Sequence, residues 1–240
     1  MSTQSWLTSA TTHCGAVRKM NEDALMCRTE DGFWAVADGM GGHDAGEIAS
    51  EMITTALATM DVDLDIPDLV DSIEDTLLAV HNEIRVYSRA NCEGRTMGST
   101  VVAMFARGNM GVCLWAGDSR LYRYRGGMLE QVSEDHSQVN EMLSRGLITP
   151  EEAVNHPASN VITRAVGATD ALYVDVLVFE MKQKDIYVLC SDGLYGALSH
   201  DEMLSRLRLS SVENYADDFV SDSLKNEARD NVTVVAVQAL

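Results

Sequence analysis

Acidic residues stand at several points of the chain where an apolar run ends or begins, often beside glycine. These residues are Asp38, Asp118, Asp192 and Asp230, with Glu22 and Asp23 as a further acidic position ahead of the first apolar run. Asp38 and Asp192 each follow a strongly apolar run and precede a glycine. A single Asp-Gly pair is more often a turn than a ligand. Its recurrence at separate strand ends favours one shared acidic site.

Carboxylates that converge repel one another and raise each other's pKa. A divalent cation removes that cost, and oxygen ligands without histidine or thiolate partners suit Mg²⁺ or Mn²⁺. Gly39 has no side chain, so its carbonyl oxygen can approach such a metal closely. The acids therefore predict a divalent-cation site. An acid excess that serves only solubility is the plainer alternative.

Other catalytic motifs fail in detail. The glycine-rich run 39–46 has no Lys-Ser/Thr after it, so it is not a phosphate-binding P-loop, and Asp44 stands where a dinucleotide fingerprint needs glycine. Asp38 is not followed by the second aspartate of a dehalogenase-type nucleophile, and the Gly-x-Ser-x-Gly elbow of serine hydrolases is absent.

Composition restricts the partners. The chain has 240 residues and a formal net charge of −19, which disfavours nucleic acid and anionic membrane surfaces. Its 5 cysteines are scattered without a Cys-x-x-Cys pair and indicate reduced core thiols. No signal pattern and no membrane-spanning apolar stretch is visible, so the sequence predicts a cytoplasmic protein.

The spacing of apolar residues predicts a mixed architecture. Helical spacing appears over 48–60, with Asp44 near its N-cap, and over 69–87, with Pro67 near its start. Strands are expected at 33–37, 99–106, 110–116, 121–125, 173–179, 186–191 and 232–237, and further helices at 203–207 and 212–224. The order does not alternate strictly between strand and helix, which favours an α+β fold of antiparallel sheets covered by helices. No linker or repeat divides residues 1–240, and residues 137–168 are expected to form a short helical excursion from a single domain.

Six segments, in order along nearly the whole chain, resemble the metal-dependent serine/threonine protein phosphatases (type 2C) in their short bacterial form. They are Arg18-Lys19-Met20-Asn21-Glu22-Asp23, Val36-Ala37-Asp38-Gly39-Met40-Gly41-Gly42, Gly98-Ser99-Thr100, Ala116-Gly117-Asp118-Ser119-Arg120, Ser191-Asp192-Gly193 and Arg229-Asp230-Asn231-Val232-Thr233. The resemblance implies a four-layer α-β-β-α sandwich, two antiparallel sheets flanked by helices. It also implies that residues 137–168 form a mobile flap beside the active site.

The resemblance implies a role for each acid. Asp38 would bridge two metal ions, Mn²⁺ or Mg²⁺, and the Gly39 carbonyl would bind one of them. Asp192 and Asp230 would hold the other. Glu22 would contact the site directly or through water.

Three further roles are implied. Asp118, together with Asp192, would hold a third metal ion. Arg18 would bind the phosphate of the substrate through its guanidinium. Asp23 would lie behind the metal ligands and support them.

The implied reaction is hydrolysis of phosphoserine and phosphothreonine in proteins. A water between the two cations is activated, attacks phosphorus in line, and leaves no covalent phosphoenzyme. Met40 stands where many eukaryotic members carry a histidine thought to act as general acid, and His43 is not at that position. We therefore expect a metal-bound water to protonate the leaving oxygen. His136, at the border of the flap, is expected to be a structural hydrogen-bonding residue.

The expected partners are phosphorylated proteins and a separately encoded opposing Ser/Thr kinase. A monomer is expected because no unexplained exposed apolar stripe stands out. Two alternatives remain: a catalytically silent scaffold or metal sensor, and a phosphatase for small phosphoesters. The presence of all the implied carboxylates argues against a silent protein, whereas only a substrate panel separates small phosphoesters from phosphoproteins.

Overall fold

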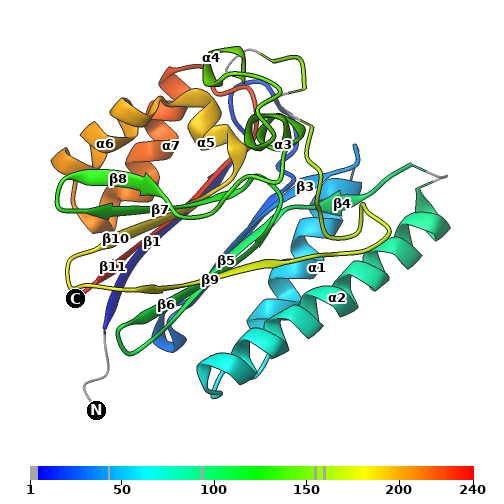
Figure 1. Cartoon of the computed structure of the whole chain (residues 1–240), viewed down its shortest axis with the longest axis horizontal. Helices are drawn as coiled ribbons and strands as arrows, with labels where there is room; N and C mark the ends of the chain where they lie inside the picture. The colour runs from blue at the N-terminus through cyan, green and yellow to red at the C-terminus, as the bar shows by residue number, and fades with distance from the viewer. Residues whose placement is uncertain (1–4, 43, 93–94, 154–155, 159–160) are drawn as a thin grey trace.

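Two antiparallel sheets lie face to face, with helices on both outer faces (Figure 1). The computed structural model describes residues 5–42, 44–92, 95–153, 156–158 and 161–240. The first sheet has the strand order β1 (Trp6–His13), β11 (Val232–Ala239), β10 (Ile186–Cys190), β7 (Arg120–Arg125) and β8 (Met128–Gln131). The second has the order β2 (Asp23–Arg28), β3 (Phe33–Met40), β5 (Val101–Arg107), β6 (Met110–Ala116) and β9 (Asp175–Glu180), with β4 (Gly98–Ser99) paired to the end of β3.

Each outer face of the sandwich has its own helices. The second sheet is covered by α1 (Ala45–Thr59) and α2 (Ile66–Asn91), and the first by α5 (Asp192–Ala197), α6 (His200–Leu209) and α7 (Tyr215–Lys225) (Figure 1). Short 3₁₀ turns occupy Thr29–Asp31 and Val212–Asn214. The predicted α-β-β-α sandwich is confirmed.

Three apolar clusters fill the three interfaces between the four layers. In β3, Phe33 and Ala35 face the α1–α2 layer, whereas Trp34 and Val36 face the other sheet. This alternation follows from the two-residue period of a strand whose two faces are both covered. Every residue of β10 is buried for the same reason, which explains its continuous apolar sequence.

The predicted long helices are confirmed with small shifts of their ends. In α2 the Asp65 side chain accepts a hydrogen bond from the Asp68 amide at 3.0 Å, and Pro67 lies in the first turn. Asp44 is the N-cap of α1, as expected, although its side chain makes no capping hydrogen bond.

Strands β1, β2 and β8 and helix α5 were missed from the sequence. Strand β8 has 4 residues, too few to show an alternating period. Strand β1 alternates half-buried and exposed residues and carries threonine and serine, so its apolar signal is weak. Strand β2 begins at Asp23, which the sequence had placed ahead of the first strand. Helix α5 has 6 residues, too few to show a helical period.

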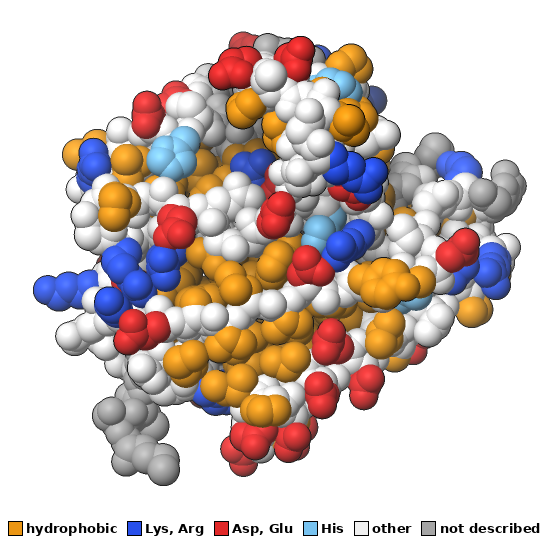
Figure 2. Space-filling model, viewed as in Figure 1, with side chains coloured by type: hydrophobic (Ala, Val, Ile, Leu, Met, Phe, Trp, Pro, Cys, Tyr) orange, Lys and Arg blue, Asp and Glu red, His pale blue; other side chains and the backbone are white. Residues whose placement is uncertain are grey.

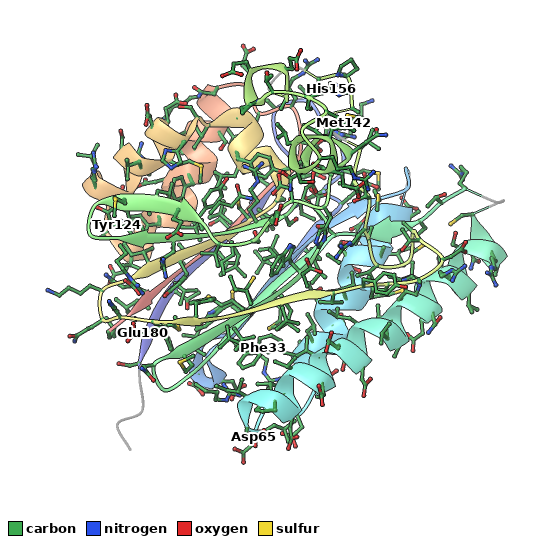
Figure 3. All side chains as sticks on the ribbon, in the orientation of Figure 1. Phe33, Asp65, Tyr124, Met142, His156 and Glu180 are labelled. Atoms are coloured by element: carbon green, nitrogen blue, oxygen red, sulfur yellow. The ribbon has the colours of Figure 1, made fainter. Side chains whose placement is uncertain are left out.

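The predicted helical excursion at 137–168 contains α3 (Gln138–Ser144) and α4 (Pro150–Ala153). It lies beyond one end of the sheets, where Figure 3 labels Met142 and His156, whereas Asp65 lies at the opposite end of the molecule. We refer to residues 137–168 as the flap segment.

The outer strand β9 exposes Val176, Leu177 and Val178, with relative accessibilities of 38%, 40% and 48%. Apolar side chains are visible along this side of the molecule in Figure 2. The sequence had indicated no such stripe, because three apolar residues in a row also suit a central strand. Within the described residues, no helix is both long and apolar enough to cross a membrane.

Candidate metal centre

The acids meet where the ends of both sheets come together. Asp23 and Asp38 are direct partners in the β2–β3 ladder of the second sheet. Strands β10 and β11 belong to the first sheet. Asp192 begins α5 just after β10, and Asp230 lies two residues before β11. The Ser191 amide donates to the Thr233 carbonyl at 3.1 Å and keeps these two strand ends together.

Asp38 lies at the centre of this cluster. Burial raises its pKa well above the usual range, and the negative charges of the other aspartates raise it further; these are Asp23, Asp192, Asp118 and Asp230. The Asp38 amide donates to the Thr100 hydroxyl at 3.1 Å, and that hydroxyl lies 2.7 Å from the Ser119 hydroxyl. The backbone of Asp38 is thus tied to the turn that carries Asp118.

The neighbouring acids share this electrostatic strain. Burial, followed by the charges of Asp118 and Asp230, raises the pKa of Asp192 to about 7. Burial, followed by the charge of Asp135, raises the pKa of Asp118 to about 6. A divalent cation would relieve this repulsion directly.

Glu22 and Asp23 lie behind Asp38. Burial raises the pKa of Asp23 to about 6, although its Oδ2 accepts hydrogen bonds from the hydroxyls of Ser191 and Thr233, each at 2.7 Å. Burial also raises the pKa of Glu22. The charge of Asp230 also raises the pKa of both residues, so both lie near the other acids.

Three oxygens decide whether a metal fits here. Oε1 of Glu22, Oδ1 of Asp23 and Oδ1 of Asp192 are shielded from solvent and have no hydrogen-bond partner among the residues that the structure describes. Unpartnered buried carboxylate oxygens are costly, and hard divalent cations prefer them as ligands. Within the described residues, no three acidic, histidine or cysteine side chains are already drawn together as a metal-binding group. The donor set fits a cation that would itself draw the carboxylates inward.

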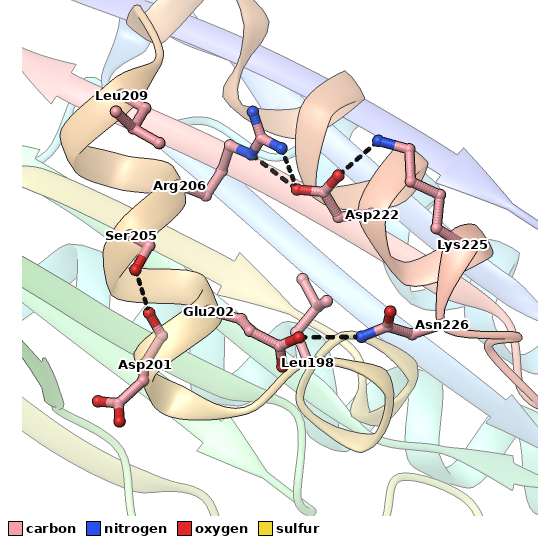
Figure 4. Close-up of a pocket in the computed structure, with 9 residues that line it drawn as sticks. All are labelled: Leu198, Asp201, Glu202, Ser205, Arg206, Leu209, Asp222, Lys225 and Asn226. Atoms are coloured by element: carbon pink, nitrogen blue, oxygen red, sulfur yellow. Dashed lines mark hydrogen bonds and ion pairs between the residues drawn. The ribbon is translucent and has the colours of Figure 1, made fainter.

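A cavity of about 390 Å³ between α6 and α7 offers a contrast (Figure 4). There Arg206 and Lys225 both pair with Asp222. Glu202 accepts hydrogen bonds from Ser199 and Asn226. The carboxylates of Asp222 and Glu202 are supplied with donors, and that of Asp201 is exposed to solvent, so this cavity is a structural ion-pair groove.

A larger cavity, of about 860 Å³, opens beside the acid cluster. Its lining includes Asp118, Asp192 and Asp230 together with residues of the flap segment: Ser137, Val139 and Ala153. A ligand in this cavity would touch acids and flap at once.

Arg18 lies at the rim, half-exposed, where its Nη2 donates to Asp230 Oδ2 at 2.7 Å. The second Asp230 oxygen accepts from the Asn231 amide at 2.9 Å. The sequence had assigned Arg18 to a substrate phosphate and Asp230 to a metal. The structure pairs the two residues with each other, and Arg18 keeps further N–H donors beside this pair.

Gly39 is required by close packing. A Cβ at Gly39 would lie 2.1 Å from the Gly46 carbonyl oxygen and 2.5 Å from that of Glu22. Only glycine lets the end of β3 approach both α1 and Glu22. Met40 is the last residue of β3, and His43 lies outside the described residues.

Several positioning residues went unrecognised in the sequence. The Asn231 side chain accepts from the Glu22 amide at 2.8 Å and donates to the carbonyls of Cys14 and Met20. The Tyr195 hydroxyl donates to the Asp118 carbonyl at 2.9 Å. Asn231 adjoins a predicted ligand, which was a usable signal, whereas no sequence pattern connects Tyr195 with Asp118.

A two-sheet sandwich with a cation-fitting acid cluster at one end defines a class of metal-dependent hydrolases, and comparison with known proteins places the chain within it. The model of the family described as protein phosphatase 2C matches residues 12–229. The chain therefore belongs to the protein phosphatase 2C family.

Curated relatives support this membership. The serine/threonine phosphatase stp of Listeria monocytogenes serotype 4b is 34% identical over 238 residues, which cover 93% of this chain and 92% of that protein. The serine/threonine protein phosphatase PstP of Mycobacterium tuberculosis is 34% identical over 226 residues, 94% of this chain and 43% of that protein.

Solved structures agree. PppA, a key regulatory component of T6SS in Pseudomonas aeruginosa, superposes with a TM-score of 0.90 at 38% identity and covers 98% of both chains. The catalytic domain of PstP in complex with 2 manganese ions gives a TM-score of 0.88 at 33% identity, with 99% of this chain and 100% of that chain covered. The predicted fold, family and enzyme class are confirmed.

Proposed function

We propose that the acid cluster hydrolyses phosphoserine and phosphothreonine in proteins with the help of Mn²⁺ or Mg²⁺. The observation that carries this proposal is the set of buried, unpartnered oxygens on Glu22, Asp23 and Asp192 around the high-pKa Asp38. Relatives named serine/threonine phosphatases and a relative's structure with 2 manganese ions support it.

The proposed ligands follow the cluster. Asp38, the Gly39 carbonyl, Asp192 and Asp230 would hold two cations, and Glu22 would contact the site directly or through water. Asp118, with Asp192, serves a third. Asp23 holds these ligands from behind through the hydroxyls of Ser191 and Thr233. When bound, such cations lower the pKa of a water and neutralise charge on the phosphoryl oxygens.

The protein residues provide binding and orientation. Arg18 gives one N–H to Asp230, and a guanidinium has further donors, which we assign to the phosphoryl oxygens. The thioether of Met40 holds no transferable proton, so we assign the proton of the leaving oxygen to water in the site. His43 is not needed in this scheme.

We extend the proposal to the setting of the enzyme. Residues 1–240 act as one catalytic domain with the flap segment beside its active site. The chain works in the bacterial cytoplasm opposite a Ser/Thr kinase. It acts as a monomer, because a net charge of −19 on each copy opposes self-association at the β9 edge.

The first experiment is hydrolysis of a phosphothreonine peptide with Mn²⁺, without it, and with chelator. Turnover that requires Mn²⁺ supports the proposal. Bound Mn²⁺ without turnover on the peptide or on whole phosphoproteins indicates a silent scaffold, and turnover of small phosphoesters alone indicates a different substrate class. Absence of Mn²⁺ binding overturns the ligand assignment. Light scattering in solution tests the monomer.

A further inference from the structure

His136 holds both backbone polar groups of the residue that precedes Asp118. The Gly117 amide donates to His136 Nδ1 at 3.1 Å, and the His136 amide donates to the Gly117 carbonyl at 2.9 Å. Gly117 has a φ of +121°, a conformation that other residues rarely adopt. The His136 contacts hold this turn on its N-terminal side, and the hydrogen bond from Tyr195 to the Asp118 carbonyl holds it on the other.

The contacts fix the tautomer of the ring. Because Nδ1 accepts from Gly117, the proton lies on Nε2, which donates to Asp175 Oδ2 at 3.2 Å. Burial lowers the pKa of His136, in keeping with a neutral ring. The ring also stacks on Trp115, with centroids 5.9 Å apart and planes at 12°.

The other side of His136 belongs to the flap segment. Asp175 accepts a second hydrogen bond, from Arg164 Nη1 at 2.5 Å. The Thr163 amide donates to the His136 carbonyl at 2.7 Å, and an isolated bridge joins Ser137 to Ile162. The outgoing and returning chains of the flap segment therefore meet at His136.

We propose that His136 is a positioning residue that couples the base of the flap segment to the turn bearing Asp118. A displacement of Arg164 or Asp175 releases the ring, and the released ring no longer fixes the Gly117 amide. The consequence for turnover rests on the proposed function, which places Asp118 in the active site. The coupling itself does not, and it is measurable in metal-free protein.

The decisive variant is Asp175→Ala, because no hydrogen bond joins Asp175 to Gly117. The metal-free protein is labelled with ¹⁵N, and amide exchange at Gly117 is measured together with the ring nitrogen shifts of His136. The wild type should show a protonated Nε2 and a protected Gly117 amide. In Asp175→Ala we expect about tenfold faster exchange at Gly117 and mixed tautomers at His136, because the loss of one hydrogen bond is worth about a factor of ten.

Two further variants separate the arms of the coupling. In His136→Asn the side-chain oxygen can still accept from Gly117 but does not reach Asp175, so trypsin should cleave faster after Arg164 while Gly117 stays protected. In His136→Gln the longer amide reaches Asp175 but lacks the Nδ1 acceptor, so Gly117 should lose protection. His200→Gln is the control, since His200, the first residue of α6, contacts the Leu129 carbonyl in β8, away from the flap segment.

The coupling is wrong if Asp175→Ala leaves both the Gly117 exchange and the tautomer as in the wild type, or if His136→Asn and His136→Gln change the two readouts alike. Should His136→Gln fail to fold, the wild-type tautomer and Asp175→Ala still decide. If the coupling is present, kcat for the phosphothreonine peptide should fall about tenfold in Asp175→Ala with little change in KM. A wild type without turnover refutes the proposed function and leaves the exchange result intact.

Discussion

Two aspartates flank the central strand β10, the buried Asp185 and the half-buried Asp192, and their hydrogen bonding differs. Asp185, before the strand, receives hydrogen bonds from Arg125 Nε at 2.8 Å and Nη2, from the Lys182 amide at 2.7 Å and from the Tyr187 hydroxyl at 3.0 Å. Asp192, after the strand, keeps Oδ1 shielded from solvent and without a partner.

Their acidities diverge accordingly. Burial alone would raise the pKa of Asp185, but the hydrogen bonds of Arg125, Lys182 and Tyr187 outweigh it and leave the pKa below its usual value. Burial and neighbouring carboxylates raise the pKa of Asp192 to about 7. The difference shows that burial alone does not set the pKa of a carboxylate: hydrogen-bond donors lower it at Asp185, and neighbouring negative charges raise it further at Asp192.

The largest expected effect is at Asp38, in the acid cluster for which we propose cation binding. Asp38→Asn should remove Mn²⁺ binding and lower kcat about a thousandfold or more, because metal ions supply several kcal/mol of transition-state stabilisation. The metal-free variant should melt about 2–5 °C higher than the metal-free wild type, because one repelling charge is gone. Calorimetry and peptide turnover measure both.

Asp65→Asn is the matched control for Asp38→Asn, because asparagine also caps a helix and Asp65 lies at the opposite end of the molecule (Figure 3). It should change neither property. Near-normal turnover of Asp38→Asn would refute the metal assignment.

Substitutions around Asp185, where hydrogen-bond donors surround the carboxylate, should change the free energy of unfolding but not turnover. Arg125→Met leaves the buried Asp185 without its cationic partner and should cost about 2–3 kcal/mol, at the lower end for a broken buried pair because Arg125 is partly exposed. Arg123→Met removes a similar pair to the exposed Glu130 and should cost less than about 0.5 kcal/mol. Urea unfolding compares them. A loss of Mn²⁺-dependent turnover in folded Arg125→Met would mean that the surroundings of Asp185 and the acid cluster are not independent.

The contributions of Asp192 and Asp185 to stability should change with pH in opposite directions. The folded-state pKa of Asp192 is about 7, above its unfolded value, so metal-free protein binds more protons when folded and should gain stability as pH falls from about 7 towards 4. Asp185 has a lowered folded-state pKa, so its contribution is lost only as pH falls below the usual range for aspartate.

Thermal melting of metal-free protein across this pH range is the test. The gain should be smaller in Asp192→Asn and vanish with saturating Mn²⁺. An equal gain in the wild type and in Asp192→Asn would show that Asp192 is not its source.

The smallest expected effect concerns the proton donor. His43→Ala should leave kcat nearly unchanged with a phosphopeptide, because we assign protonation of the leaving oxygen to water in the site and not to a side chain. A fall of about a hundredfold, the usual scale for a lost general acid, would contradict this.

Much of the site could be predicted because its residues carry local signals. Asp38 and Asp192 each follow an apolar run and precede a glycine, and the surrounding segments match a family pattern in order. The long helices and the central strands were predicted because their apolar periods are complete. Strand β1 and helix α5 were missed because one is half polar and the other is shorter than two turns.

Three features carry no such signal in the sequence. They are the pairing of Arg18 with Asp230, the hydrogen bonds between His136 and Gly117, and the hydrogen-bond donors around Asp185. Each joins residues that lie far apart in the sequence and meet only in the folded protein.

The sequence by itself determined which carboxylates sit at strand ends, and with them the family and the chemistry that those oxygens favour. Only the tertiary structure decided which of those carboxylates remain without donors. Residue type fixes how many hydrogen bonds a carboxylate can accept, but its pKa depends on burial and on charges from distant segments. Asp185 and Asp192 are therefore the same residue type with opposite pKa shifts, because Arg125 reaches one and a cluster of acids surrounds the other.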